Sequence, residues 1–174
     1  LEVANYFAQG DEPRYETPSF RRSNAFEATQ REVMAVRDSV GINETHNFGK
    51  YRIFGLKTRT WLNKILAGRI PSQGRLSLTP MLSPKGRLIG DFTVSCLSEN
   101  EFQLTASYGS QAYHMRWFLK NQSSGVEIEN ISDTLTGFQI AGPNATKVLD
   151  AVSMIEIESL KFLDVRRMVV GMIN

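Results

Sequence analysis

Apolar residues recur at helical spacing early in this 174-residue chain, and short apolar runs follow further on. Between residues 25 and 39 the apolar side chains fall on one stripe of a helix. Asn24 before this stripe and Glu27 three positions later resemble a capping box, in which the two side chains bond free backbone amides. Gly41 is expected to end the helix, because glycine readily adopts the left-handed backbone found at helix C-termini.

Shorter apolar runs predict the elements that follow. A strand at 48–54 leads through Gly55 into a helix at 57–67, and the same order of strand, glycine and helix returns around Gly142, 87 positions later (142 − 55). Two such units in one antiparallel sheet predict an α+β fold, a mostly antiparallel sheet with flanking helices. Chance similarity is the alternative, because this order of elements is common. The other predicted elements are a strand at 101–106, a helix at 111–120 and final strands at 160–173.

The most informative stretch is a predicted β-hairpin between residues 74 and 97. Two apolar runs, at 76–78 and at 88–89 within an expected strand 87–97, flank a tight connection, Ser-Pro-Lys-Gly, at 83–86. Proline presets its own φ, and glycine can take the positive φ that tight reversals commonly need. The second run is therefore expected to fold back on the first.

Asp91 stands in the second hairpin strand, between Gly90 and Phe92. A carboxylate inside an apolar strand is costly to desolvate unless a partner pairs with it, and Gly90 leaves room for a flat ligand or another backbone to come close. One interpretation is a carboxylate that faces a ligand. The other is an ordinary sheet-face aspartate that meets solvent or caps a loop, since antiparallel strands commonly have one wet face.

Composition narrows the function classes. A net charge of +2 with scattered basic residues does not indicate nucleic-acid binding. The chain has two histidines, His46 and His114, and a single cysteine, Cys96, so neither a zinc site nor an internal disulfide is expected. No glycine-rich phosphate loop follows a predicted strand, so this segment does not itself carry a dinucleotide-binding fold.

The two ends of the chain carry their own expectations. Residues 1–24, rich in aromatic and turn residues, predict an extended linker arm that leads into a folded domain at 25–174. No run approaches the roughly 20 apolar residues of a membrane span, and the start does not resemble a signal peptide. The expected compartment is the cytoplasm, or the mitochondrial matrix in a eukaryote. Leu1 in place of Met and the apolar run at 167–174 suggest a fragment whose domain continues beyond residue 174.

Three motifs resemble a known family. They are Phe-Gly-Lys-Tyr at 48–51, Gly-Arg-x-x-Leu-Thr-Pro-Met-Leu at 74–82 and Lys-Gly-Arg-Leu-Ile-Gly-Asp-Phe-Thr-Val at 85–94. Together they resemble the folate-binding, aminomethyltransferase-like domain of glycine-cleavage T-protein relatives. The likeness is closer to the form that follows the flavin domain in dimethylglycine and sarcosine dehydrogenases. Further matches, in order along nearly the whole chain, lie at 5–8, 141–144 and 162–168.

The resemblance implies that the chain is the first part of a three-domain fold around a tetrahydrofolate site. In the dehydrogenases a flavin domain, which carries FAD, oxidises an N-methyl amine, and tetrahydrofolate captures the one-carbon unit as methylenetetrahydrofolate. The implied partners are the folate, the methylated amine and the rest of the same polypeptide, with no nucleic acid or membrane. Two alternatives stay open. One is a glycine-cleavage T-protein-like aminomethyltransferase that works with a lipoyl carrier, and the other is a non-catalytic folate-binding scaffold.

The resemblance also implies site residues. Plain T-proteins carry two adjacent aspartates; here the first is Gly90, which leaves Asp91 as the predicted catalytic residue. Their tyrosine before the Met-Leu pair is Leu78, and their asparagine after the next strand falls at or near Ser107. These departures agree with the dehydrogenase branch. The predicted cofactor-binding residues are Gly90, Leu78, Met81, Ser107, Tyr108 and His114, and no metal ligand is predicted.

Overall fold

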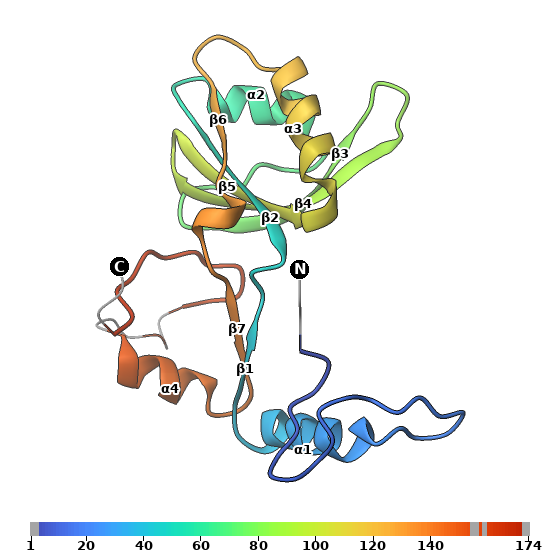
Figure 1. The fold of residues 1–174 in the computed structure, drawn as a ribbon. Helices are drawn as coiled ribbons and strands as arrows, with labels where there is room; N and C mark the ends of the chain where they lie inside the picture. Colours follow the sequence, from blue (N-terminus) through green and yellow to red (C-terminus); the bar gives the residue numbers. More distant parts are fainter. Residues whose placement is uncertain (1–3, 154–156, 158–159, 172–174) are drawn as a thin grey trace.

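The computed structural model describes residues 4–153, 157 and 160–171, which form two antiparallel sheets with flanking helices (Figure 1). The larger sheet has the strand order β3-β4-β5-β2-β6, and the smaller one pairs β1 with β7. Every one of these pairs is antiparallel, so the predicted α+β class is confirmed. The strands are β1 (Gly41–Glu44), β2 (Phe48–Phe54), β3 (Leu76–Leu82), β4 (Leu88–Ser98), β5 (Glu101–Ser107), β6 (Glu127–Asn130) and β7 (Phe138–Ala141). The helices are α1 (Ala25–Asp38), α2 (Thr58–Ile65), α3 (Gln111–Lys120) and α4 (Ala145–Val152), with short 3₁₀ turns η1 (Tyr108–Ser110) and η2 (Ser132–Thr134).

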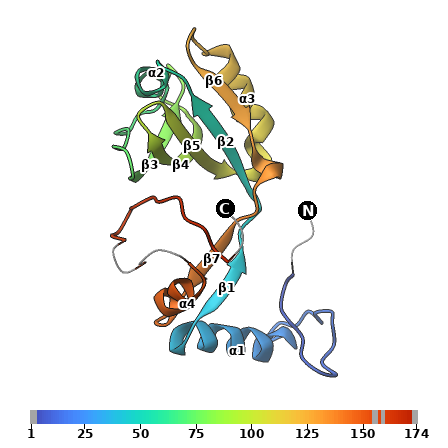
Figure 2. The ribbon, with the colours of Figure 1, turned by 90° about the vertical axis from the view of Figure 1, so that its left-hand side faces the viewer.

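Strand alternation builds the core of the five-stranded sheet. Along β5, Phe102, Leu104 and Ala106 are buried, whereas the residues between them are partly exposed. This is the period of a strand with one face on the core and one wet face. Helices α2 and α3 contribute Trp61 and Phe118 to the same core, and they flank the sheet in Figure 2. The opposite face of the sheet is polar, and it carries the candidate site.

The predicted hairpin is confirmed. Strands β3 and β4 pair antiparallel, for example through Thr79 and Phe92, and the connecting Gly86 has a φ of +72°. The strand predicted at 48–54 and the helix predicted at 111–120 have the bounds observed for β2 and α3. Local apolar pattern and turn chemistry are therefore sufficient to locate the elements around Asp91.

The two strand–glycine–helix units share a local backbone but lie in different sheets. Gly55 and Gly142 have φ angles of +121° and +120°. A Cβ on Gly55 would collide with the Gly125 carbonyl, and one on Gly142 with the Ser39 carbonyl, so both positions require glycine. The predicted local structure is confirmed, but the placement in one sheet is wrong. Strand β2 lies in the five-stranded sheet, whereas β7 pairs only with β1 among the described strands.

The helix predicted at 25–39 is observed within one residue, but the roles predicted for two residues at its ends are wrong. Helix α1 ends at Asp38, and Gly41 is instead the first residue of β1, where its missing side chain makes room for Val36. Asn24 forms no capping box, because its side-chain oxygen accepts a hydrogen bond from the Thr17 amide (2.7 Å) in the segment before the helix. In both places a tertiary contact replaces the local role that the sequence suggested.

The strands at the end of the chain also differ from the prediction. In place of final strands, residues 160–171 form isolated bridges to Arg75 and Ser153, and positions 172–173 lie outside the described residues. Strands β1 and β6 are absent from the prediction because Gly-Ile-Asn-Glu and Glu-Ile-Glu-Asn each hold a single apolar residue, which gives no alternation to detect.

Residues 4–24 contain no helix or strand and lie beside α1 (Figure 1). Two contacts attach them to this helix. Arg31 forms an ion pair with Glu12 (2.8 Å), and the Phe7 amide donates a hydrogen bond to the Glu32 carboxylate (3.0 Å). The segment is thus held by polar contacts and not by strand pairing.

Two general properties of the described residues bear on function. Their helices are too short or too polar to cross a lipid bilayer. They also hold no cluster of three or more His, Cys, Asp or Glu side chains arranged to bind a metal ion.

Candidate functional site

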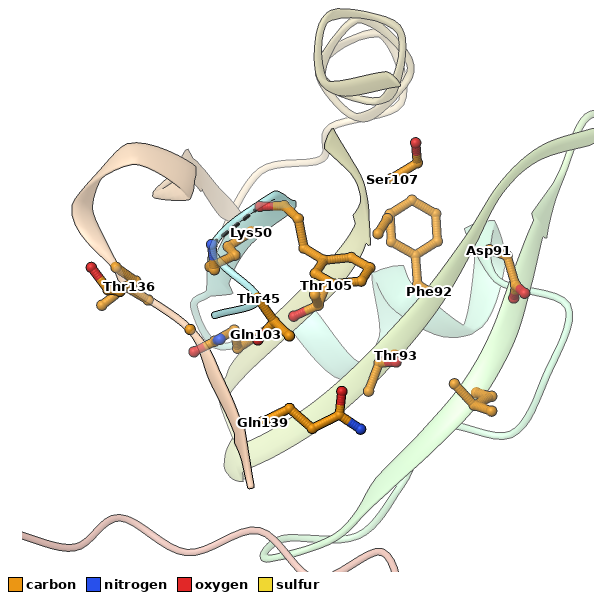
Figure 3. Close-up of a pocket in the computed structure, with 15 residues that line it drawn as sticks. Thr45, Lys50, Asp91, Phe92, Thr93, Gln103, Thr105, Ser107, Thr136 and Gln139 are labelled. Carbon is orange, nitrogen blue, oxygen red and sulfur yellow. Dashed lines mark hydrogen bonds between the residues drawn. The ribbon is translucent and has the colours of Figure 1, made fainter. Parts of the chain in front are cut away.

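A cavity of about 580 Å³ opens over the polar face of the five-stranded sheet (Figure 3). Strands β2 to β5 supply its floor, and the segment 135–137 with Gln139 and Thr45 supplies a wall. This volume falls in the range of small-molecule sites, about 300–1,000 Å³. The lining mixes hydroxyl, amide and charged groups with a few apolar side chains, which is the composition of a site that orients a ligand.

The floor is a row of side chains across four neighbouring strands. The register pairs Leu78 with Thr93, Thr93 with Thr105, and Thr105 with Lys50. All four residues line the cavity. Directly opposed side chains in a sheet lie about 5 Å apart on the same face. The row is therefore apolar at one end, hydroxyl-lined in the middle and basic at the other end.

Asp91 lies two residues before Thr93 on β4 and is exposed at the cavity. Within the described part of the chain its carboxylate has no hydrogen-bond or ion-pair partner. Figure 3 shows it on the opposite side of the cavity from Lys50. Because the carboxylate is exposed, it avoids the desolvation cost of a buried strand position. The carboxylate meets solvent and also borders a cavity. Its position is therefore compatible with a ligand-facing carboxylate and with an ordinary sheet-face aspartate.

A second cavity, of about 640 Å³, shares Phe48, Asp91 and Ser107 with the first. It lies between the first residues of β4 and the η1 turn at the start of α3. The predicted cofactor-binding residues divide between the two cavities. Leu78 lines the first, Gly90, Tyr108 and His114 line the second, Ser107 lines both, and Met81 lines neither because it is fully buried in the core.

The His114 ring fills the space that Gly90 leaves open. A Cβ on Gly90 would lie 2.5 Å from His114 Nε2. The residue is only 1% exposed, and its Nδ1 lies 3.0 Å from Tyr51 Oη. Burial lowers the pKa of His114, against the opposing effect of a hydrogen bond to the Ile89 backbone. Burial also raises the pKa of Tyr51 to about 12. The close neighbour of Gly90 is thus a buried histidine ring, where the sequence suggested a ligand or another backbone.

Lys50 is a site residue that sequence reasoning missed. It is only 5% exposed, and its Nζ donates to the carbonyl oxygens of His46 (2.9 Å) and Phe48 (3.2 Å). An ammonium group has three donors, so one donor and a positive charge remain for a ligand on this side of the cavity. A lysine inside an apolar strand is a detectable signal, but residues 135–137, which line the cavity together with it, come much later in the sequence.

Comparison with known sequences identifies the family. A profile of the GCVT N-terminal domain matches residues 1–174. The mitochondrial dimethylglycine dehydrogenase of Homo sapiens is 35% identical over 171 residues, which cover 95% of this chain and 20% of that protein. The aminomethyltransferase of Natranaerobius thermophilus is 27% identical over 135 residues, which cover 76% of this chain and 37% of that protein. The chain therefore spans well under half the length of either relative.

Solved structures support the same placement. The glycine cleavage system aminomethyltransferase T from Bartonella henselae superposes with a TM-score of 0.66 and 17% identity, over 79% of this chain and 38% of that protein. The heterotetrameric sarcosine oxidase from Corynebacterium sp. U-96 gives a TM-score of 0.53 and 17% identity, over 80% of this chain and 70% of the matched chain. These likenesses confirm the expected T-protein-like fold. With the profile that covers the whole sequence, they show that the chain belongs to the GCVT N-terminal domain family.

Proposed function

We propose that this chain is the tetrahydrofolate-binding part of a flavin-dependent dehydrogenase of an N-methyl amine, dimethylglycine or sarcosine. In this role it serves the capture of the one-carbon unit as methylenetetrahydrofolate. The observation that carries the proposal is the Asp91 carboxylate, which borders a cavity of about 580 Å³ and has no partner among the described residues. The amine oxidation and the FAD belong to the rest of the polypeptide.

The cavity lining suits a reduced pterin. A flat heterocycle with N–H groups needs apolar contacts on its faces and a few hydrogen-bond partners at its edges. Phe48 and Leu78 supply apolar surface, and Gln103, Thr105 and Asp91 supply donors and acceptors. The residues present therefore fit the group in size and in polarity.

Asp91 has the chemistry that one-carbon transfer requires. Bound tetrahydrofolate would supply nitrogen nucleophiles that accept the one-carbon unit. The Asp91 carboxylate would accept a hydrogen bond from an N–H group, orient that group and take up its proton. Its negative charge would also stabilise a neighbouring cation. Proton transfer by a positioned side chain contributes about 10²–10⁴-fold to a rate.

Two observations favour the dehydrogenase over the aminomethyltransferase assignment. The chain is 35% identical to the human dehydrogenase over 95% of its length, and 27% identical to the Natranaerobius aminomethyltransferase over 76%. Gly90 also stands where the resemblance places the first of two T-protein aspartates. The His114 ring occupies the space that a side chain at Gly90 would need, so a second carboxylate would have to displace this ring.

The variant Asp91→Asn in the full-length protein tests the proposal. Because asparagine keeps the size of the side chain but removes its charge, we expect methylenetetrahydrofolate formation to fall by about 10²-fold or more. Reduction of the flavin by dimethylglycine or sarcosine should be unchanged. Glu127→Gln is the matched control, since Glu127 is an exposed carboxylate on β6 that lines neither cavity. Equal loss of both activities in Asp91→Asn would refute the division of labour.

The aminomethyltransferase is the second candidate, favoured by the higher TM-score of the Bartonella structure. It predicts that the full-length protein binds an acidic lipoyl-carrier protein and accepts a one-carbon unit from it. Failure to bind this carrier, together with flavin reduction by an N-methyl amine, would decide for the dehydrogenase.

A further inference from the structure

We propose that His114 is the positioning residue for Asp91. Its ring holds a β-bulge at Ile89 and so fixes the direction in which the Asp91 side chain leaves β4. The inference rests on the function proposed for Asp91. His114 would act through the backbone of its neighbours on β4 and not through contact with a ligand.

The β-bulge lies close to Asp91 on the same strand. Two consecutive residues of β3 pair with Leu88 and Gly90, which leaves Ile89 as an extra residue on β4. Counted from the hairpin turn, strict alternation would place Ile89 and Asp91 on the same, inner face. The extra residue reverses the phase, so that Ile89 and Gly90 are both buried and Asp91 is exposed. Bulges commonly re-aim side chains near functional sites, and this one turns Asp91 towards the cavity.

Strand pairing supports this part of β4 from one side only. Among the described residues β4 pairs with β5 only from Thr93 onward, so β3 is the single ladder partner at the bulge. A bulged residue leaves its backbone groups outside the regular ladder, and a buried carbonyl without a partner is costly. The His114 ring packs directly against the residue that follows the bulge, since a Cβ on Gly90 would lie 2.5 Å from Nε2, and so the ring supports the bulge.

The ring itself is fixed by its neighbours. Its Nδ1 lies 3.0 Å from Tyr51 Oη, and its centroid lies 4.8 Å from that of the Phe92 ring. Its Nε2 faces Gly90. In the tautomer that is protonated at Nε2, the N–H faces the bulge and Nδ1 accepts a hydrogen bond from the Tyr51 hydroxyl. The ring therefore contacts the residue before Asp91 and the residue after it.

Two substitutions in the full-length protein separate the donor from the bulk of the ring. His114→Gln keeps an N–H donor near the position of Nε2, whereas His114→Leu fills the space without a donor. We expect His114→Leu to lower kcat for methylenetetrahydrofolate formation by roughly 10- to 100-fold, since a small misplacement of a catalytic group has effects of this size. The KM for tetrahydrofolate and the rate of flavin reduction should change little. His114→Gln should restore most of the lost rate.

A double-mutant cycle with Asp91→Asn is the decisive measurement. If His114 acts through Asp91, His114→Leu slows one-carbon capture when Asp91 is present and has no further effect in the Asp91→Asn background. Equal factors in the two backgrounds would overturn the positioning role but leave the proposed role of Asp91 intact. An Asp91→Asn variant with normal one-carbon capture would overturn both.

Crystal structures of the variants give a measurement that is independent of activity. We expect the backbone at 89–91 to shift in His114→Leu and to keep its path in His114→Gln, and an unchanged path in His114→Leu would contradict the proposal. If His114→Leu does not fold, Tyr51→Phe replaces it. That substitution removes the hydrogen bond to Nδ1 while the aromatic ring stays, and the same cycle with Asp91→Asn decides between the same outcomes.

Discussion

Helices α2 and α4 follow strands β2 and β7 through the same kind of glycine turn, yet only α2 is built into a core. The residues that precede the two helices, Lys57 and Asn144, have nearly the same backbone angles, with φ, ψ of −104°, 8° and −100°, 8°. Helix α2 buries Thr58, Trp61 and Leu62, whereas none of the residues of α4 is buried within the described structure. The local sequence therefore determines the backbone of both units, and the surroundings determine their burial.

The two sheets explain this difference. The five-stranded sheet offers a wide apolar face against which α2 and α3 pack. The β1–β7 ribbon has two strands, and large apolar side chains on it, Ile42 and Phe138, stay exposed. A two-stranded ribbon is at best marginally stable alone, because it cannot bury a hydrophobic face. The candidate site lies where the well-packed sheet faces this ribbon, with Gln139 of β7 on its wall.

The largest expected effect comes from one equivalent leucine in each helix. Leu62 of α2 is fully buried, and Leu149 of α4, 87 positions later (149 − 62), is partly exposed. We expect Leu62→Ala to lower the free energy of unfolding by about 2–5 kcal/mol, as in other large-to-small core substitutions. Leu149→Ala should lower it by less than about 1 kcal/mol, because few contacts are lost there. Urea denaturation of the 174-residue chain measures both.

The slope of the unfolding free energy against urea concentration serves as the internal control for this pair of variants. If the slope is unchanged, a shift of the midpoint reports stability and not a change in the compactness of either state. Equal losses for the two variants would show that α4 is packed as closely as α2 and would remove the contrast between the units.

The glycines of the two units should behave alike where the leucines differ. Gly55 and Gly142 share a φ near +120°, and a Cβ on either would meet a backbone carbonyl. Alanine at either position should therefore lower the free energy of unfolding by about 1–3 kcal/mol, since this strain is local. Gly109→Ala is the control, because a Cβ there meets nothing within 4 Å. If only Gly55→Ala lowers the free energy of unfolding, the turn before α4 can accommodate a Cβ by a small backbone shift.

The sequence predicts these local features well because each depends on a few neighbouring residues. The hairpin follows from apolar runs around Pro84 and Gly86, and the turn at Gly142 from its likeness to Gly55. Sheet membership depends on pairing across long separations, as in the contact of Gly41 with Ala141 in β1 and β7. The sequence offers no local signal for that choice, which is why the two units were expected in one sheet.

The candidate site divides in the same way. The hairpin pattern alone places Asp91 on a strand beside a tight turn. The hydrogen bond from the Lys50 amide to Ser132 Oγ and the hydrogen bond between Tyr51 and His114 each join distant segments. The bulge that turns Asp91 outward also has no signature in the run Leu-Ile-Gly-Asp-Phe, since it appears only once β3 and β4 are paired. Tertiary packing supplies this part of the site.

The smallest expected effect is a pH dependence of the free energy of unfolding, which reports on the core of the five-stranded sheet. His114 lies in the core below the five-stranded sheet, and burial lowers its pKa below the ordinary value of 6.5. The unfolded chain therefore binds more protons than the folded chain in the window just below pH 6.5. Stability is present above this window and is lost as the pH falls through it towards the lower pKa of the folded state. Tyr51, with a pKa raised to about 12, stays neutral throughout.

His114→Gln should flatten this part of the profile, because glutamine does not titrate while its amide can keep a hydrogen bond to the Ile89 backbone. Urea midpoints measured between pH 7 and pH 5.5 for both proteins test this, in a range that lies above the ordinary pKa values of carboxylates. If the wild-type and His114→Gln profiles run parallel, His114 does not titrate differently in the folded and unfolded chains. Parallel profiles would therefore contradict the lowered pKa that burial gives to the ring beside Gly90.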